Sequence, residues 1–197
     1  MQGVFFGVVV HTIYDCVDAF SKLLYTEYEI ILGRKNQKVT LRVQFNKKDL
    51  YHLLGFQYLK DRPELNHDRE KIFNALIRRK ISAEHIESSH HYEKIKDRVN
   101  FLPYLEMIFD DNHTIFKYNE EFSNLSLIKA NYLLENTIEE RSIYTFLSKN
   151  DDDNYFCRSF FPKTNHDYTI GQTSWTLLYK KKIDKKAKTE IIVYNRL

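Results

Sequence analysis

The sequence has few glycines, prolines and cysteines, and it lacks a hydrophobic run long enough to cross a membrane. Five glycines and three prolines among 197 residues leave little material for flexible linkers between separate units. The length lies within the usual range of one domain and is sufficient to bury a substantial core. We therefore expect residues 1–197 to form a single domain.

The apolar segment near the start of the chain, residues 3–10, is too short to span a bilayer and follows no basic region. It predicts a packed N-terminal segment or the opening of the first helix. The two cysteines, Cys16 and Cys157, lie far apart and do not have the spacing of metal ligands. This pattern favours two buried free thiols in a reducing cytoplasm, without a membrane partner.

Motifs for metals and cofactors are also missing. The sequence has no P-loop, no glycine-rich dinucleotide turn, no HExxH and no cysteine–histidine metal spacing. His85, His90 and His91 are close in sequence, but adjacent helical residues point about 100° apart and do not converge. We interpret these histidines as part of a solvated polar face, and we expect neither a metal nor a cofactor.

Charge is nearly balanced, with 30 Lys and Arg residues against 27 Asp and Glu residues. A net charge of +3 does not by itself predict a nucleic-acid partner, so a basic site must come from local clustering. Lys180, Lys181 and Lys182 form such a cluster with three further lysines close behind them. This basic segment favours a solvated turn, and contact with phosphate is the alternative.

The most regular pattern lies in residues 28–60. It predicts two strands joined by a turn at 33–37, and apolar and polar residues alternate along the second strand, 39–46. Asn46 is a candidate cap for the helix that follows, and Gly55 is the expected end of that helix. The stretch therefore indicates a hairpin that leads directly into a short helix.

Helices and strands occupy different halves of the chain. Helical periodicity covers residues 11–25, 67–80, 82–86 and 92–110, the last with a kink at Pro103. The predicted strands of the second half are 113–118, 125–135, 141–149, 155–161, 174–182 and 190–194. Their short connections favour an antiparallel meander. We predict an α+β fold in which N-terminal helices and a β-hairpin are followed by a curved antiparallel β-sheet.

His52 lies in the helix after the hairpin, away from the centre of the stripe formed by Leu50, Leu53 and Leu54. Its imidazole titrates near neutral pH, which makes it a candidate general base. A structural histidine with satisfied hydrogen bonds is the alternative. Cations, hydroxyls and an aromatic ring near a histidine could hold a phosphodiester and stack a base. The candidates for these roles are Arg42, Arg158, Ser159, Lys163, Thr173, Ser174 and Trp175.

The run TEYEIILGRKNQKVTLRVQFNKKDLYHLLGFQYLKD resembles the phage-associated barnase–EndoU–colicin–RelE-like nuclease domains, most closely their fourth subtype. The segments IKANYLLEN, CRSFFP and YTIGQTSWTLLYKKK are similar to the same family, so the resemblance covers most of residues 20–195. It implies a metal-independent ribonuclease of phage, mobile-element or toxin type, with helices before an antiparallel sheet. The helical segment 66–110 is longer than such a nuclease needs, which suggests an insertion or a subdomain.

The resemblance makes His52 the strongest catalytic candidate, as the base that removes the proton of a 2′-hydroxyl in RNA. The other roles are a phosphate-stabilising cation (Arg158, with Lys163 or Arg42), a positioning hydroxyl (Ser159, Thr173 or Ser174) and a ring that stacks a base (Trp175). The expected partners are RNA and an inhibitor or antitoxin protein.

Two other functions are compatible with the sequence. A catalytically inactive RNA- or protein-binding domain could have the same fold, because no compact catalytic signature is present. A transferase that uses an adenine dinucleotide could be built on a comparable mixed fold, although no residue pattern favours it.

Overall fold

The computed structural model describes residues 10–111, 114–122 and 127–197. Within them, eight strands form one sheet in the order β1-β2-β6-β5-β4-β3-β7-β8, and a further pairing of β1 with β7 closes seven of them into a barrel. The strands are β1 (Thr26–Arg34), β2 (Gln37–Gln44), β3 (Thr114–Lys117), β4 (Tyr132–Ile138), β5 (Arg141–Lys149), β6 (Tyr155–Pro162), β7 (Thr173–Asp184) and β8 (Thr189–Asn195).

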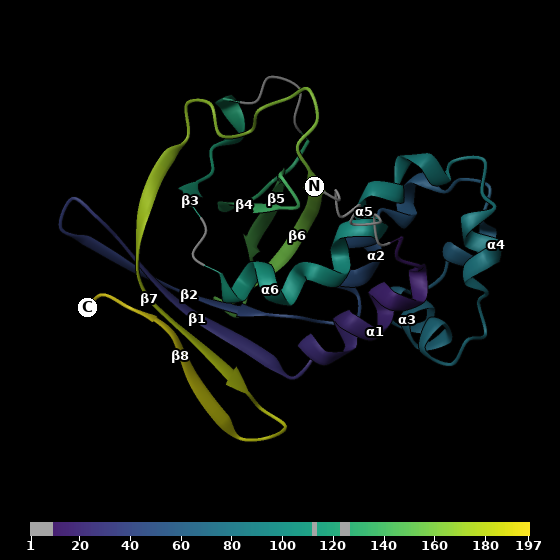
Figure 1. The fold of residues 1–197 in the computed structure, drawn as a ribbon, viewed down its shortest axis with the longest axis horizontal. Helices are drawn as coiled ribbons and strands as arrows, with labels where there is room; N and C mark the ends of the chain where they lie inside the picture. The colour runs from purple at the N-terminus through teal and green to yellow at the C-terminus, as the bar shows by residue number, and fades with distance from the viewer. Residues whose placement is uncertain (1–9, 112–113, 123–126) are drawn as a thin grey trace, which may run out of the picture.

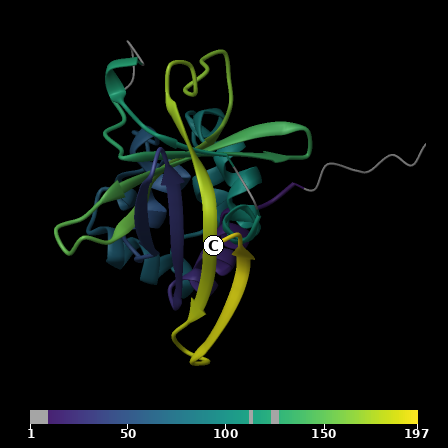
Figure 2. The ribbon, with the colours of Figure 1, turned by 90° about the vertical axis from the view of Figure 1, so that its left-hand side faces the viewer.

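The predicted α+β class is confirmed, but the sheet differs from the expected curved antiparallel meander. All strand pairs are antiparallel except β2 with β6, which meet in parallel at a single bridge between Val43 and Tyr155. Strand β7 is long enough to pair with β3 near its start and with β1 and β8 further on. Figure 2 shows β7 and β8 running side by side as a hairpin that continues beyond the barrel.

The first hairpin forms where the alternation predicted it. Strands β1 and β2 pair in register from Glu27 with Gln44 to Arg34 with Gln37. The turn between them is shorter than expected, because Lys35 and Asn36 alone take positive φ angles, of 44° and 63°. Two such residues match the twist of the flanking strands in a tight hairpin.

The helices gather to one side of the strands in Figure 1 and bury their apolar faces in one large cluster. They are α1 (Ile13–Leu23), α2 (Asp49–Leu54), α3 (Arg69–Ile77), α4 (Ala83–Glu87), α5 (Lys96–Phe101) and α6 (Leu105–Asp110). Thr12 and Asp15 cap α1 reciprocally, since each side chain accepts a hydrogen bond from the other residue's backbone N–H. The predicted break at Pro103 is confirmed, because a 3₁₀ turn, Leu102–Tyr104, separates α5 from α6.

Several predicted boundaries are wrong. Asn46 does not cap α2 with its side chain: Lys48 is the N-cap residue, and the Asp49 carboxylate accepts a hydrogen bond from the Asn46 backbone at 2.8 Å. Strand β4 begins at Tyr132 and continues to Ile138, where a turn was expected. The predicted starts of two strands, residues 113 and 125–126, and most of the apolar segment 3–10 lie outside the described residues.

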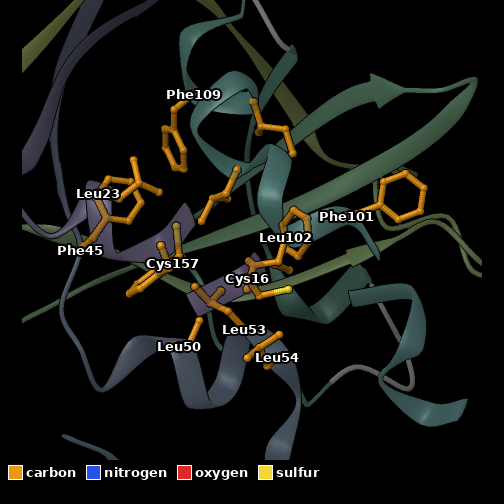
Figure 3. Packing of buried hydrophobic residues seen from close by; sticks show 14 of the residues in the cluster. Cys16, Leu23, Phe45, Leu50, Leu53, Leu54, Phe101, Leu102, Phe109 and Cys157 are labelled. Atoms are coloured by element: carbon orange, nitrogen blue, oxygen red, sulfur yellow. The ribbon is translucent and has the colours of Figure 1, made fainter. Parts of the chain in front are cut away.

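Both cysteines are buried free thiols, as predicted. Cys16 and Cys157 lie among the apolar side chains of the large cluster (Figure 3), where burial raises the pKa of each thiol. The described residues contain no helix that is long and apolar enough to cross a membrane.

The basic segment near the C-terminus is only partly the solvated turn that its composition favours. Lys180 is fully buried and donates a hydrogen bond to the backbone carbonyl of Asp111. The ammonium of Lys182 lies 2.7 Å from the Asp110 carboxylate and 2.8 Å from that of Glu106. These contacts fix the end of α6 against β7, and Tyr28 of β1 adds a 2.7 Å hydrogen bond to Asp110.

Candidate nuclease site

His52 lies in the second half of α2, which packs against β6 (Figure 1). Leu50, Leu53 and Leu54 are buried in the core, whereas His52 is half-buried, as its position outside their stripe predicted. The helix ends at Gly55, whose φ of 79° lets its N–H donate to the His52 carbonyl at 3.1 Å. The short helix therefore fixes the backbone of His52 at the edge of the barrel.

The surroundings of His52 lower the pKa of its imidazole below the ordinary 6.5. Burial is the largest cause, followed by the positive charges of Arg69 and Arg158, while the nearby Gln57 side chain opposes the shift. A lowered pKa leaves the ring neutral at pH 7, and a neutral imidazole can accept a proton. The side chain is thus electrostatically suited to act as a base.

Arg158 occupies a β-bulge in strand β6. Leu147 of β5 pairs with Cys157 and Phe146 pairs with Ser159, so Arg158 is the extra residue between the two pairs. Cys157 belongs to the core and Arg158 is exposed. The bulge therefore directs a cation out of the sheet on the strand that packs against α2.

Arg98 of α5 is a candidate that sequence reasoning missed. Its side chain has an exposed fraction of only 9%, and its Nη1 donates a 2.5 Å hydrogen bond to the carbonyl oxygen of Phe160. The guanidinium lies 5.1 Å from the centre of the Phe161 ring. Burial lowers its pKa, and within the described residues no carboxylate forms an ion pair with it. A buried cation without a counter-ion is costly, and an anionic ligand would offset that cost.

A signal for Arg98 exists in the sequence, although it is weak. Arg98 follows Ile95 by three residues and precedes Leu102 by four, so it shares a helix face with core positions. A charge on such a face must pair or face a cavity. Helical periodicity alone does not show which of these holds.

Arg98 and Ser159 line an open hollow of about 330 Å³, which we name the aromatic hollow. Its lining consists of Tyr58, Arg98, Leu127, Ile128, Ser159, Phe161 and Tyr168. Arg98 Nη1 also lies 3.5 Å from the carbonyl oxygen of Leu53, the residue after His52 on α2, and its charge contributes to the low pKa of His52. The structure therefore groups three predicted residues, His52, Arg158 and Ser159, with the unpredicted Arg98.

Two predicted substrate-binding cations lie elsewhere. Arg42, on β2, lines a separate groove beside the β5–β6 turn, and its Nε lies 3.9 Å from the Glu29 carboxylate. Lys163 follows β6, and its ammonium forms a 2.5 Å ion pair with Asp167. Asp167 also accepts a hydrogen bond from the Tyr144 hydroxyl at 3.0 Å, so Lys163 takes part in a local structural network.

The predicted group on β7 is separated from β6 by several strands. Thr173 pairs with Lys117 of β3, and Trp175 pairs with Ile115 of the same strand. Strands β5, β4 and β3 lie between β6 and this end of β7 in the sheet. Trp175 is half-buried against the large core cluster, and Ser174 is exposed. The roles predicted for these three residues stay predictions, and we leave them out of the proposed site.

The three clustered histidines lie at the surface. His85 Nε2 lies 3.1 Å from the Glu64 carboxylate, and His90 Nδ1 lies 3.6 Å from that of Asp61. Across residues 10–111, 114–122 and 127–197, no three His, Cys, Asp or Glu side chains gather in a way that could hold a metal ion.

A comparison with models of known protein families identifies the family of the chain. Residues 12–197 match the model of the family described as phage-Barnase-EndoU-ColicinE5/D-RelE like nuclease4, abbreviated PBECR4. The chain belongs to this family. The resemblance found in residues 26–61 and across most of residues 20–195, including its assignment to the fourth subtype, is confirmed. Searches of curated proteins and of solved structures found no match.

Membership of PBECR4 gives the site a chemical context. The family is of the barnase/EndoU/colicin/RelE nuclease type and is associated with phages. The matched range contains α2, α5 and β6, and therefore the whole group of His52, Arg98, Arg158 and Ser159. A nuclease must bind a phosphodiester, and this group offers cations and a neutral base in one place.

Proposed function

We propose that this PBECR4 domain is a metal-independent endoribonuclease that cleaves RNA through the 2′-hydroxyl of its own substrate. The observation that carries the proposal is the position of His52, a half-buried imidazole on the helix that packs against β6, where the bulge exposes Arg158. The charges of Arg69, Arg158 and Arg98 lower the pKa of this imidazole. A base that is neutral at pH 7 and surrounded by cations is suited to act beside a bound phosphate.

In this mechanism His52 removes the proton of the 2′-hydroxyl. The 2′ oxygen then forms a bond to phosphorus, and the bond from phosphorus to the 5′ oxygen of the next nucleotide breaks. The leaving oxygen takes a proton from the solvent that reaches the open hollow. The products are a 2′,3′-cyclic phosphate and a 5′-hydroxyl, and no redox step or co-reactant is needed.

Two arginines stabilise the negative charge that develops on the phosphate. Arg98 is buried and held by the Phe160 carbonyl, so its guanidinium is already oriented before substrate binds. Arg158 is exposed on the bulge and supplies a second cation from the neighbouring strand position. Ser159 lines the hollow and offers a hydroxyl to a phosphate oxygen, while the exposed ring of Tyr58 can stack on a base.

The test is cleavage of a single-stranded RNA oligonucleotide in the presence of EDTA. We expect the wild-type protein to cleave and the His52→Ala variant to lose at least about 100-fold in rate, as is usual for a general base. His90→Ala is the matched control, because that side chain is 92% exposed and belongs to the segment after α4. Abolition of cleavage by EDTA would refute metal independence, and full activity of His52→Ala would refute the role of His52.

The same assay addresses the inactive-domain alternative. RNA binding without turnover, in wild-type protein and in both variants, would show that the domain binds RNA and does not cleave it.

A further inference from the structure

Positive charge is concentrated in one part of the chain. Residues 47–80 contain nine Lys and Arg residues against five Asp and Glu residues, whereas the rest of the chain has 21 against 22. The net charge of the whole protein is therefore carried by α2, α3 and their connection. This is the local clustering that a near-neutral protein needs in order to bind a polyanion.

Helix α3 has a buried apolar face and an exposed face that carries positive charge. Ile72, Phe73 and Leu76 are buried against the core. Lys71 and Arg78 are seven residues apart, about 10 Å along the helix and on a common exposed face.

A shallow hollow of about 320 Å³ lies on this face, lined by Lys71, Asn74, Ala75, Arg78 and Lys80. The ammonium of Lys47, from the start of the α2 region, donates a 3.1 Å hydrogen bond to the Asn74 side chain and extends the basic surface. We name Lys47, Lys71, Asn74, Arg78 and Lys80 the α3 patch.

The cations of the α3 patch lack carboxylate partners. In the described part of the chain none of Lys47, Lys71, Arg78 and Lys80 forms an ion pair, whereas the adjacent Arg79 lies 2.7 Å from Asp18. At the start of α3, Asp68 accepts hydrogen bonds from the backbone of Glu70 and Lys71 as the helix cap. Its charge is thus directed at the helix end.

Arg69 connects the α3 patch with His52. It is the first residue of α3, it is exposed, and its guanidinium lies 5.4 Å from the centre of the Tyr51 ring. Tyr51 precedes His52 on α2, and the charge of Arg69 lowers the pKa of His52. Arg69 and Lys47 also line one small hollow beside Tyr51. These two cations therefore link the surroundings of His52 to the α3 patch.

We propose that the α3 patch binds the phosphate backbone of RNA at nucleotides beyond the bond that is cleaved. The inference rests on the proposed function for the identity of the polyanion. RNA is favoured over an anionic membrane because Arg69 joins the patch to the site, and a chain that enters the site must leave it along some surface. Binding at the patch would be largely independent of sequence, because lysine and arginine contacts to phosphate carry no base information.

The test measures binding of a fluorescent 20-nucleotide 2′-O-methyl RNA, which cannot undergo 2′-hydroxyl attack, by anisotropy at several salt concentrations. The variant is Lys71→Gln/Arg78→Gln/Lys80→Gln. Its matched control, Lys35→Gln/Lys186→Gln/Lys188→Gln, removes the same number of exposed cations, which form no ion pair within the described residues, from the ends of the β1–β2 and β7–β8 hairpins. All six residues are exposed, so both variants should fold, which circular dichroism will verify.

We expect the slope of log affinity against log salt to fall by about 2 in the α3 variant, from about 0.7 per lost phosphate contact. The control should change it by less than half as much. An equal change in both variants, or none in the α3 variant, would overturn the proposal. The proposal would also be overturned if the α3 variant lost binding to anionic lipid vesicles while its salt slope for RNA stayed unchanged.

A kinetic arm separates this inference from the proposed function. The ratio of kcat/KM for a 20-nucleotide RNA to that for a dinucleotide should fall about tenfold in the α3 variant and stay constant in the control. An unchanged salt slope in the α3 variant, together with an inactive His52→Ala, would refute only RNA binding by the α3 patch. A reduced salt slope in the α3 variant, together with an active His52→Ala, would refute only the role of His52 as the base.

Discussion

Gly55 ends α2 next to the candidate site. The structure predicts how much stability the protein loses when this glycine is replaced by alanine. The backbone has a φ of 79°, a left-handed conformation that costs an L-residue about 1–2 kcal/mol. A Cβ atom would also lie 3.0 Å from Arg98 Cδ, 3.0 Å from Ile95 Cγ2 and 3.1 Å from Tyr58 Cδ2. Ile95 and Arg98 are buried, so crowding adds about 1–3 kcal/mol.

Gly171→Ala is the matched control for this change. Gly171 has a similar φ of 75°, but its nearest neighbour, Phe122 Cγ, would be 3.3 Å away. The Phe122 side chain is 56% exposed and can move, so we expect only the backbone cost of about 1–2 kcal/mol.

Urea unfolding monitored by circular dichroism measures both losses by linear extrapolation. We expect Gly55→Ala to lose about 1–3 kcal/mol more than Gly171→Ala, the difference being the crowding around Arg98 and Ile95. The same variant should cleave RNA up to about 100-fold more slowly, because small displacements of positioned groups reduce rates strongly. Equal losses of stability in the two variants would refute the packing described around Gly55.

Three further predictions follow from single side chains. Arg98→Met should lower kcat about 100-fold or more, because it removes a cation that the Phe160 carbonyl orients. The lowered pKa of His52 predicts that the acid-side fall of kcat/KM has its midpoint below pH 6.5, because the imidazole must be unprotonated to act as a base. Lys182→Met should cost about 1–3 kcal/mol in urea unfolding, because Asp110 and Glu106 lose their shared cation.

Each of these predictions has a clear contrary result. An unchanged kcat in Arg98→Met would refute the catalytic role proposed for Arg98, whatever the effect on stability. A midpoint of this decline above pH 6.5 would contradict the environment described for His52. Wild-type stability of Lys182→Met would show that the ion pairs at the end of α6 contribute nothing, as is common for exposed pairs.

The local parts of the fold were predictable because their signals are local. Alternation in residues 39–46 and the glycine at position 55 give the hairpin and the end of α2 without knowledge of the rest of the chain. The parallel bridge between Val43 and Tyr155 had no such signal, since it joins residues far apart in sequence. Closure of the barrel depends on this bridge and on the pairing of β1 with β7.

The candidate site was only partly predictable for the same reason. His52 could be selected from its helix position and Arg158 from its aromatic strand. Thr173 was grouped with them by its residue type, and the sequence did not show where its strand lies. The sheet order places three strands between β6 and the start of β7. Arg98 was missed because its importance comes from a contact with the Phe160 carbonyl, which helical periodicity does not reveal.

The most direct test of the central claim is the chemistry of the RNA ends produced in EDTA. Mass spectrometry of a cleaved oligonucleotide should show 2′,3′-cyclic phosphates and 5′-hydroxyls with the wild-type protein. With His52→Ala neither end should accumulate above the background. Products with 3′-hydroxyl ends, or the same cyclic ends at an undiminished rate from His52→Ala, would contradict the account.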